Sequence, residues 1–479
     1  MILSILVNPV ILSFLLFMNA CHNIIPGKKA VVLGMGLSGM AVAKLLQRHQ
    51  FDVFVSDIKE PLQLSDRLKE LRQHHIPCET GGHSGERLLQ ADFIVISPGI
   101  PERIEVVQKA LKKGIPLYSE IEVASWFCRA PVIGITGTNG KTTTTTLTGN
   151  FIRTTFPGSF VGGNIGIPFA DRADQLSKAD FAVLELSSFQ LERIRLFCAN
   201  IAVMLNLSPD HLDRYARYED YIAAKARILE NQTQDDVFIY NADDPQVTEL
   251  AGSAKSKKLP FSFTRKPEAG LYFDGENFSH LDEYGEHHLT SVRNVKLKGW
   301  HNYQNVCAAT SAAITAGVPL DRISTELSTF NGIEHRIEYL GQAHGIHFYN
   351  DSKATNTDAL YWALRSFDKP LILLAGGLAK EHDFSRVEPL INEKVKMLYL
   401  FGASRDKIHA GLNLDQKVQV CKTNDLQESF QRATRSAQSG DIILLSPMCA
   451  SLDQYRSFEE RGKHFKKLVR EFRIKKPLS

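Results

Sequence analysis

The run GITGTNGKT at residues 134–142 decides the fold of the central part of this 479-residue chain. An apolar stretch at 131–133 precedes it and a threonine-rich segment follows, so we predict a strand, a glycine-rich loop and a helix in that order. Backbone N–H groups of such a loop surround nucleotide phosphates, while Lys141 reaches the outer phosphates and Thr142 can bind Mg2+. A strict phosphate-binding loop has glycine in place of Ile135, and the alternative is a glycine-rich turn with an exposed lysine. The coincidence of strand, glycines, lysine and threonine favours a triphosphate site.

A second glycine-rich turn, GMGLSG at residues 34–39, lies between a predicted buried strand at 30–33 and an apolar helix. Asp57 ends the next predicted strand, at 51–55, and SPGIP at 97–101 follows another one. This pattern is typical of a doubly wound sheet that binds a dinucleotide, although the same turn occurs in such sheets without that ligand. A dehydrogenase would account for this turn alone, and a small GTPase for the central turn alone.

Three more features extend the nucleotide interpretation of the central part. GGNIG at residues 162–166 is a further glycine-rich turn. Glu185 lies at the end of a predicted strand at 181–186, where a second Mg2+ ligand belongs in a nucleotide site, although alone it would be a surface acid. His211 follows a predicted strand at 201–205 and is either a ligand or a capping residue.

The composition excludes several classes of protein. A hydrophobic fraction of 43% and a charged fraction of 23% are ordinary for a globular protein, and the length suggests about three domains. The 56 basic and 53 acidic side chains nearly balance, so nothing indicates a nucleic-acid partner. The seven cysteines include no CxxC pair, which argues against a disulfide framework and favours a reducing cytoplasm.

The N-terminal extension, residues 1–26, is unusual because its first 25 residues carry no Lys, Arg, Asp or Glu. A secretory signal begins with positive charge, and the apolar run here is interrupted by Asn8, Pro9 and Ser13 and is short for a membrane span. We expect no stable membrane anchor. We interpret Met18 as the true start of the protein, with a membrane anchor as the alternative.

The order of these motifs resembles that of the Mur ligases of peptidoglycan synthesis, together with the folylpolyglutamate synthases. The shared features are TGTNGKT, GGNIG, the Glu-x-Ser-Ser strand, Asp-His-x-Asp and a helical lysine, and the resemblance extends from about Lys28 to the C-terminus. It implies an α/β chain of three domains: a Rossmann-like N-terminal domain at 27–119 for a UDP-linked substrate, a central P-loop-type ATPase domain at 120–332, and a Rossmann-like C-terminal domain at 333–479 for an amino acid.

The C-terminal part distinguishes among members of that family. GGLAKEHDF at 376–384, SPMCASLDQY at 446–455 and FEERG at 458–462 are similar to the members that add D-glutamate, and the DNPR run of diaminopimelate-adding members is absent. The resemblance therefore implies an ATP-dependent ligase, a cytoplasmic monomer, that joins D-glutamate to UDP-N-acetylmuramoyl-L-alanine through an acyl phosphate. Another Mur-type ligase, a folylpolyglutamate synthase-like ligase and a non-enzymatic nucleotide switch are the alternatives.

The resemblance also implies roles for individual residues. Lys141, His211 and Lys225 are implied to be catalytic. ATP contacts are implied for Gly137, Thr138, Asn139, Gly140, Lys141, Thr142, Thr143, Asn302, Asn305, Arg336, Asp351 and Lys353. UDP-substrate contacts are implied for Leu37, Ser38, Asp57, Gly99 and Asn164, and D-glutamate contacts for Thr355, Lys380, Ser451 and Phe458. Two Mg2+ ions are implied to be held by Thr142, Glu185, His211 and Lys225.

Lys225 is the least expected of these residues. Without the resemblance it would be a solvated lysine of a predicted helix at 221–228, but the family lysine carries a carbamate derived from CO2, which turns a cation into an oxygen donor for Mg2+. We expect HNYQN at 301–305 to lie just before an alanine-rich helix. Ile58, Lys59 and Met448 depart from the family pattern. We interpret the basic last helix, with its first arginine at Arg461, as a solvated face.

Overall fold

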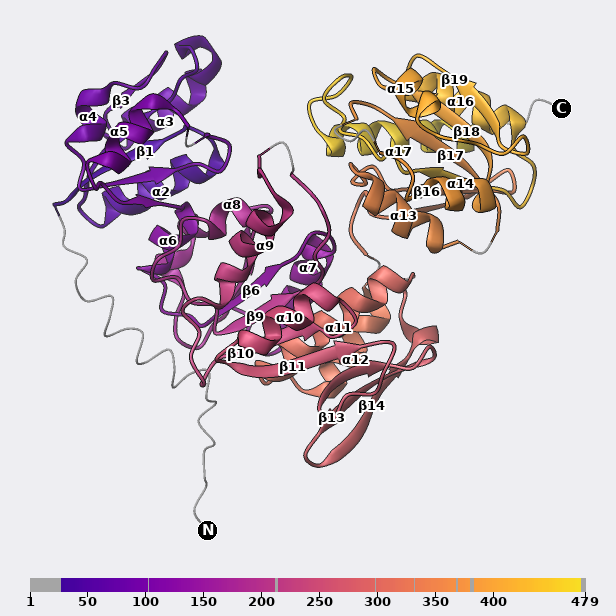
Figure 1. Cartoon of the computed structure of the whole chain (residues 1–479), viewed down its shortest axis with the longest axis horizontal. Helices are drawn as coiled ribbons and strands as arrows, with labels where there is room; N and C mark the ends of the chain where they lie inside the picture. The colour runs from indigo at the N-terminus through magenta and orange to yellow at the C-terminus, as the bar shows by residue number, and fades with distance from the viewer. Residues whose placement is uncertain are drawn as a thin grey trace. The chain divides into compact units, whose positions relative to one another are not determined.

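The computed structural model describes residues 27–101, 103–211, 214–297, 299–330, 332–367, 369–379 and 383–474, so the N-terminal extension and Lys380 lie outside the described residues. These residues form three sheets with flanking helices, which confirms the predicted α/β class (Figure 1). The chain divides into two compact units. The first runs up to Val295 and includes Gln304–Thr329, and the second comprises Lys296–Tyr303 and everything from Phe330 onward. No helix among the described residues is long and apolar enough to cross a membrane.

The first sheet is entirely parallel, with the strand order β3-β2-β1-β4-β5. Its central strands are buried runs of valine, isoleucine and phenylalanine, which is expected when helices cover both faces of a parallel sheet. The strands are β1 (Lys29–Leu33), β2 (Asp52–Ser56), β3 (Cys78–Glu79), β4 (Phe93–Ile96) and β5 (Leu117–Tyr118). The helices are α2 (Leu37–Arg48), η2 (Pro61–Leu64), α3 (Ser65–Gln73), α4 (Gly85–Leu89) and α5 (Glu105–Lys112).

The second sheet has the order β14-β13-β12-β11-β10-β9-β6-β8-β7 and is parallel except for the pairs β12–β13 and β13–β14. Its strands are β6 (Val132–Thr136), β7 (Phe160–Gly163), β8 (Ala182–Glu185), β9 (Ile201–Met204), β10 (Val237–Asn241), β11 (Lys257–Ser262), β12 (Gly270–Phe273), β13 (Asn277–Asp282) and β14 (Gly285–Ser291). The helices are α6 (Glu120–Ser125), α7 (Lys141–Thr155), η3 (Phe169–Asp171), η4 (Ala173–Gln175), α8 (Ser188–Leu191), α9 (Tyr218–Ala226), η5 (Arg227–Leu229), α10 (Pro245–Ser253), η6 (Val292–Asn294), α11 (Trp300–Thr315) and α12 (Leu320–Thr329). In Figure 1, β13 and β14 form a hairpin at the end of this sheet.

The third sheet, in the second unit, has the order β15-β16-β20-β17-β18-β19, and only the β15–β16 pair is antiparallel. Its strands are β15 (Glu338–Ala343), β16 (Ile346–Asn350), β17 (Leu371–Gly376), β18 (Val395–Phe401), β19 (Gln419–Lys422) and β20 (Ile442–Leu445). The helices are α13 (Thr357–Arg365), α14 (Glu388–Lys394), α15 (Arg405–Ala410), α16 (Leu426–Ser436) and α17 (Phe458–Ile474).

Two differences from the expected element boundaries affect motif residues. Strand β6 extends to Thr136, because the first residues of the glycine-rich motif pair with both β8 and β9 in the middle of the sheet. Helix α11 begins at Trp300, so Asn302 and Asn305 lie inside the helix and not before it. Both asparagines are buried.

The interpretation of the last helix as a solvated face is wrong for Arg461, which is fully buried. Its guanidinium donates to the side-chain and backbone oxygens of Ser352, at 3.0 and 2.8 Å, and to the carbonyl of Cys449 at 3.1 Å. Burial lowers the pKa of Arg461 to about 10, so the group stays charged at neutral pH. Carbonyl oxygens therefore replace water around this cation, and the arginine joins α17 to the loops after β16 and β20.

A buried carboxylate stabilises the central domain in a way that no motif predicted. The Trp126 indole donates to Oε1 of Glu122 at 2.8 Å, and Oε2 accepts backbone N–H groups of Arg195, Leu196 and Phe197 at 2.8, 3.0 and 2.8 Å. Glu122 is fully buried. Because the charge is surrounded by donors, this one side chain fixes the segment before β9 against α6.

We predict that Glu122→Gln lowers the free energy of unfolding by about 2–4 kcal/mol. In either orientation of the glutamine amide, its NH2 group would face N–H donors that now bind a carboxylate oxygen, and these donors would lose their acceptor in a buried site. Urea denaturation followed by tryptophan fluorescence measures the change. Glu86→Gln, at an exposed site of α4, is the matched control and should change the value by less than about 0.5 kcal/mol. Equal effects of the two substitutions would contradict the role of Glu122.

Candidate functional site

The glycine-rich loop connects the carboxyl end of β6 to the first residue of α7, Lys141. Gly140 caps this helix with a left-handed φ of 87°, and a Cβ at Gly140 would lie 2.2 Å from Oδ1 of Asn305, so only glycine fits. The Asn206 side chain accepts from the backbone N–H of Asn139 at 2.8 Å and donates to its carbonyl at 3.1 Å. The loop is therefore held in place by Asn206, which follows β9, and by Asn305 of α11. It leads directly into the dipole-positive N-terminus of α7, which suits phosphate.

Two lysines converge on one carbonyl of this loop. Nζ of Lys141 donates to the carbonyls of Gly137 and Thr138 at 2.9 and 2.7 Å, and Nζ of Lys225 donates to the Gly137 carbonyl at 2.8 Å. Lys225 is 2% exposed. Burial, and secondly the charge of Lys141, hold the pKa of Lys225 well below its usual range. The prediction from helical pattern alone, a solvated lysine, is therefore wrong.

Helix α9 positions Lys225, and the sequence motifs did not identify its main support, Tyr221. Nζ of Lys225 lies 4.8 Å from the centre of the Tyr221 ring, one turn earlier on the same helix. The Tyr221 hydroxyl shares a hydrogen bond of 3.1 Å with Oγ1 of Thr138 in the glycine-rich loop. Tyrosine one turn before a lysine is the only sequence signal for this contact.

Glu185 ends β8, next to β6 in the sheet, and pairs in register with Ile135. Its Oε1 accepts from the Asn164 side chain at 3.0 Å, while its buried Oε2 has no hydrogen-bond partner in the part of the chain that is described. The Asn164 N–H also bonds the Glu185 carbonyl, at 2.9 Å. Asn164 thus orients the carboxylate that was assigned to Mg2+, whereas the sequence assigned Asn164 to the UDP substrate.

His211 lies after β9, with a left-handed φ of 56°. Its ring contacts Phe189 with a centroid separation of 4.8 Å, and its Nε2 is 3.8 Å from Oδ2 of Asp210. The imidazole side chain is 35% exposed, so it is accessible to a ligand. Parallel strand order thus gathers Lys141, Glu185 and the segment of His211 at the carboxyl edges of β6, β8 and β9.

The donor set is compatible with nucleotide-bound Mg2+ but not with a metal held by protein alone. Among the described residues, no group of three or more His, Cys, Asp or Glu side chains could hold a metal ion. Mg2+ at nucleotide sites takes one or two protein oxygens and completes its shell with phosphate and water. The unpartnered Oε2 of Glu185 and the half-buried Thr142 at the second position of α7 fit that pattern.

The second glycine-rich turn, after β1, is held by Asp57. Oδ2 of Asp57 accepts the N–H of Met35 at 2.7 Å, and Oδ1 accepts the N–H of Lys59 at 2.9 Å. Asp57, directly after β2 at the carboxyl edge of the sheet, therefore fixes the glycine-rich turn. Leu37 is 61% exposed at the start of α2, Ser38 is half-buried, and Gly99 is exposed after β4.

In the second unit, the residues assigned to ATP cluster around the end of β16. Asp351 is buried, and its carboxylate accepts from the Ser446 hydroxyl at 2.8 Å and from the Ile337 N–H at 3.2 Å. Burial raises the pKa of Asp351 to about 7. Lys353 lies two residues further on, with Nζ 5.5 Å from the Phe458 ring centre. Half-buried Arg336 precedes β15.

Residues assigned to D-glutamate lie at the same edge of the third sheet, except that Lys380 is outside the described residues. Thr355 is half-buried between β16 and α13, and Ser451 is buried after β20. Phe458 is the first residue of α17, and its carbonyl accepts from the Ser352 hydroxyl at 2.8 Å.

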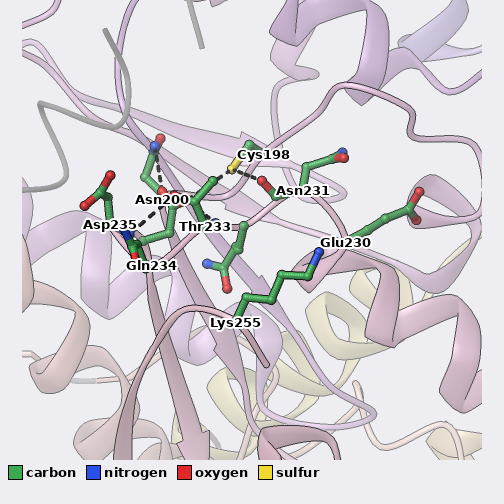
Figure 2. Close-up of a pocket in the computed structure, with 10 residues that line it drawn as sticks. Cys198, Asn200, Glu230, Asn231, Thr233, Gln234, Asp235 and Lys255 are labelled. Atoms are coloured by element: carbon green, nitrogen blue, oxygen red, sulfur yellow. Dashed lines mark hydrogen bonds between the residues drawn. The ribbon is translucent and has the colours of Figure 1, made fainter. Parts of the chain in front are cut away.

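A separate cavity of about 730 Å3 lies at the opposite edge of the central sheet (Figure 2). Its lining comes from the segments just before β9, β10 and β11, which are the amino ends of these strands. Cys198 donates to the carbonyl of Asn231 at 3.5 Å in its wall, and burial raises the pKa of this thiol. None of the motif residues lines this cavity.

Comparisons with known proteins agree with this arrangement. Residues 28–119 match the family model described as Mur ligase MurD-like, N-terminal domain, residues 135–313 match the Mur ligase middle domain, and residues 335–449 match the Mur ligase, glutamate ligase domain. A UDP-N-acetylmuramoylalanine–D-glutamate ligase of Koribacter versatilis is 41% identical over 444 residues, covering 93% of this chain and 97% of the relative. The corresponding ligase of Thermoanaerobacter pseudethanolicus is 40% identical over 450 residues, covering 93% and 99%.

Solved structures show the same fold at low sequence identity. A pseudomurein peptide ligase type C from Methanothermus fervidus superposes with a TM-score of 0.59 at 19% identity, covering 93% of this chain and all of the other. UDP-N-acetylmuramate-alanine ligase from Thermotoga maritima gives a TM-score of 0.57 at 18% identity, covering 93% and 99%. With three matching domain models and relatives of about 40% identity along most of its length, the chain belongs to the Mur ligase family.

Proposed function

We propose that this chain catalyses the ATP-dependent addition of D-glutamate to UDP-N-acetylmuramoyl-L-alanine, a step in the synthesis of peptidoglycan precursors. Relatives that share about 40% of their residues over 93% of the chain carry the name of this ligase. The observation that supports the ATP-dependent step is the convergence of Lys141 and Lys225 on the Gly137 carbonyl, beside the unpartnered carboxylate oxygen of Glu185.

The reaction needs activation of the substrate carboxylate, because an amine cannot displace oxide from it at neutral pH. Attack of the carboxylate oxygen on the γ-phosphorus of ATP breaks the bond to the bridging oxygen and releases ADP. The amine of D-glutamate then attacks the carbonyl carbon of the acyl phosphate, the C–O bond to phosphate breaks, and the nitrogen loses one proton as the amide forms. The first attack brings two anions together, and the ammonium of Lys141 reduces this repulsion when it turns from the loop carbonyls to the phosphate.

Mg2+ would reduce the same repulsion by binding phosphate oxygens. We assign Thr142 and Glu185 to one ion, and Glu185, His211 and Lys225 to a second. We assign Gly137, Thr138, Asn139 and Gly140 of the loop to the nucleotide, with Thr143 on the following helix. The N–H groups of Thr138 and Asn139 donate to Asn206, so these two residues hold the shape of the loop. From the second unit we assign Asn302, Arg336, Asp351 and Lys353 to ATP, and Asn305, which contacts Gly140 and Thr144, supports the loop itself.

Lys225 fits a carbamate better than an ammonium. Only a neutral amine attacks CO2, forming an N–C bond and releasing one proton, and the lowered pKa of the buried Lys225 favours the neutral amine. As an ammonium it would stand beside the charge of Lys141, with which it shares the Gly137 carbonyl. As a carbamate it would be attracted to Lys141 and would offer the oxygen that Mg2+ prefers.

Leu37, Ser38, Asp57, Gly99 and Asn164 are proposed to serve the UDP substrate, and Thr355, Lys380, Ser451 and Phe458 to serve D-glutamate. We place the domain boundaries at 119/120 and 332/333, which leaves each sheet within one domain. We further propose a monomer that acts in the cytoplasm without a membrane anchor. None of the six described cysteines forms a disulfide bond, which supports a reducing compartment.

The proposed function is tested by phosphate release from ATP with UDP-N-acetylmuramoyl-L-alanine and, in turn, D-glutamate, L-glutamate, L-lysine and meso-diaminopimelate. We predict turnover with D-glutamate alone, because a site built for two carboxylates and one amine leaves a buried polar group unpaired with the mirror image. Lys380→Ala should reduce kcat/KM for D-glutamate at least about 100-fold, with a smaller change for ATP. Preference for a diamino acid or for L-glutamate would overturn the choice of amino acid.

Replacing Lys225 tests the carbamate. We predict that Lys225→Ala is nearly inactive, that added bicarbonate does not restore it, and that a short carboxylic acid partly does by supplying the missing oxygen. Lys225→Arg is the matched control: it retains a cation, cannot form the carbamate, and should be equally inactive without rescue by the acid. Near-normal activity of Lys225→Ala in bicarbonate-free buffer would end the hypothesis.

A pair of substitutions separates the two nucleotide sites. Lys141→Ala should abolish catalysis and leave binding of the UDP substrate nearly intact, because its charge is needed on the transferred phosphoryl group. Asp57→Ala should raise KM for the UDP substrate about 5- to 150-fold with a smaller change in kcat, because it frees the turn at Met35 and removes an acceptor equally in ground and transition states. Weaker ATP binding by Asp57→Ala, with the UDP substrate unaffected, would reverse the assignment of the first domain.

A further inference from the structure

The loops that follow β2 and β3 are joined at the carboxyl edge of the first sheet. Ser56 and Glu79 pair in register at the ends of these strands, and the N–H of Asp57 donates to the Glu79 carbonyl at 3.1 Å. The N–H of Gly82 donates to the Asp57 carbonyl at 3.4 Å. Since Asp57 also holds the N–H of Met35, the loop after β3 is tied to the glycine-rich turn after β1 through one residue.

Three side chains form a hydrogen-bonded relay in this place. Oγ of Ser56 lies 2.7 Å from Oε1 of Glu79 and 2.7 Å from Nδ1 of His83. Ser56 is fully buried, whereas His83 is half-buried. Within the described part of the chain, Nε2 of His83 has no hydrogen-bond partner. No motif of the sequence pointed to these three residues.

The positions of the protons follow from the acceptors. Burial raises the pKa of Glu79, but hydrogen bonds from Ser56 and Ser84 outweigh it and bring the pKa below its usual value, so Glu79 is ionised and only accepts. Oγ of Ser56 has two acceptors, Oε1 of Glu79 at 2.7 Å and the Gly82 carbonyl at 3.3 Å, and its single proton goes to the nearer, charged one. The Ser56 oxygen must then accept from His83. In a neutral imidazole this places the proton on Nδ1 and leaves Nε2 as a lone-pair acceptor.

We infer that Nε2 of His83 accepts a hydrogen bond from the uridine part of the UDP substrate, either from the N–H of the base or from a ribose hydroxyl. This inference rests on the proposed function, because it places that nucleotide at the first sheet. The imidazole lies beside the turn clamped by Asp57, at the edge where doubly wound sheets bind nucleotides. The relay of Glu79 and Ser56 holds the tautomer, so Ser56 and Glu79 are positioning residues.

Electrostatics are consistent with a neutral His83. Burial lowers its pKa, and the charges of Glu79 and Asp57 oppose this effect without reversing it. These two carboxylates are the charged groups that act on the imidazole from the neighbouring loops. Binding through the lone pair is therefore available at neutral pH and is lost as the pH falls through the pKa of His83, because the protonated ring has no acceptor.

Matched substitutions in the full chain separate the acceptor from the structural role. In His83→Asn the amide nitrogen replaces Nδ1 and keeps the Ser56 contact, but nothing replaces Nε2. In His83→Gln the amide oxygen can reach the place of Nε2. We measure Kd by calorimetry for UDP, 2′-deoxy-UDP and a UDP methylated at the base N–H, at several pH values.

The wild type should bind UDP about three- to tenfold more tightly than His83→Asn, and His83→Gln should approach the wild type without its loss of affinity at low pH. The difference between wild type and His83→Asn should vanish for one analogue, which identifies the donor as the base or the ribose. Equal affinity of wild type and His83→Asn for UDP, or an equal loss with all three ligands, would overturn the inference and leave the proposed function standing. A wild type that bound no UDP, with Lys141-dependent ATP turnover intact, would instead overturn the assignment of the first domain and the inference with it.

Discussion

The site depends on the crowding of two lysine amines around one backbone carbonyl, that of Gly137. Lys141 comes from α7, the helix that follows the loop. Lys225 comes from α9, which begins only after β7, β8 and β9. Two full positive charges at a buried carbonyl repel each other, so one of them must lose its proton or be converted into an anion. Burial and, secondly, the charge of Lys141 hold the pKa of Lys225 well below its usual range, and carbamylation would remove the repulsion while creating an oxygen ligand.

Polar side chains also clamp loops at the carboxyl edges of the three sheets. Asn206 holds the glycine-rich loop, Asp57 holds the turn after β1, and Arg461 holds the loops at the edge of the third sheet. Each clamp has several partners, so its charge or amide is compensated in the interior. Rigid loops at the carboxyl edges suit a ligase, because an acyl phosphate must meet an amine before it meets water.

The sequence predicted what local patterns encode. β4 lies directly before SPGIP, where a strand was expected, and the strand–loop–helix order around Lys141 follows from apolar runs and glycines. Arg461 was misjudged, because a basic helix face looks solvated unless the carbonyls that surround it are known. The sequence could not predict the hydrogen bond between Asp57 and Met35 or the relay from Glu79 to His83. Both join residues that are brought together only by the order of the strands in the sheet.

The most direct test of the account is to look for the carbamate itself. Protein equilibrated with 13C-bicarbonate, Mg2+ and ADP should show one carbamate carbon resonance by NMR that is absent from Lys225→Arg, while resonances from exposed lysines are common to both. The resonance should weaken when CO2 is removed, together with activity. A fully active wild type whose carbamate spectrum is identical to that of Lys225→Arg would contradict the claim that this buried amine works as an anion.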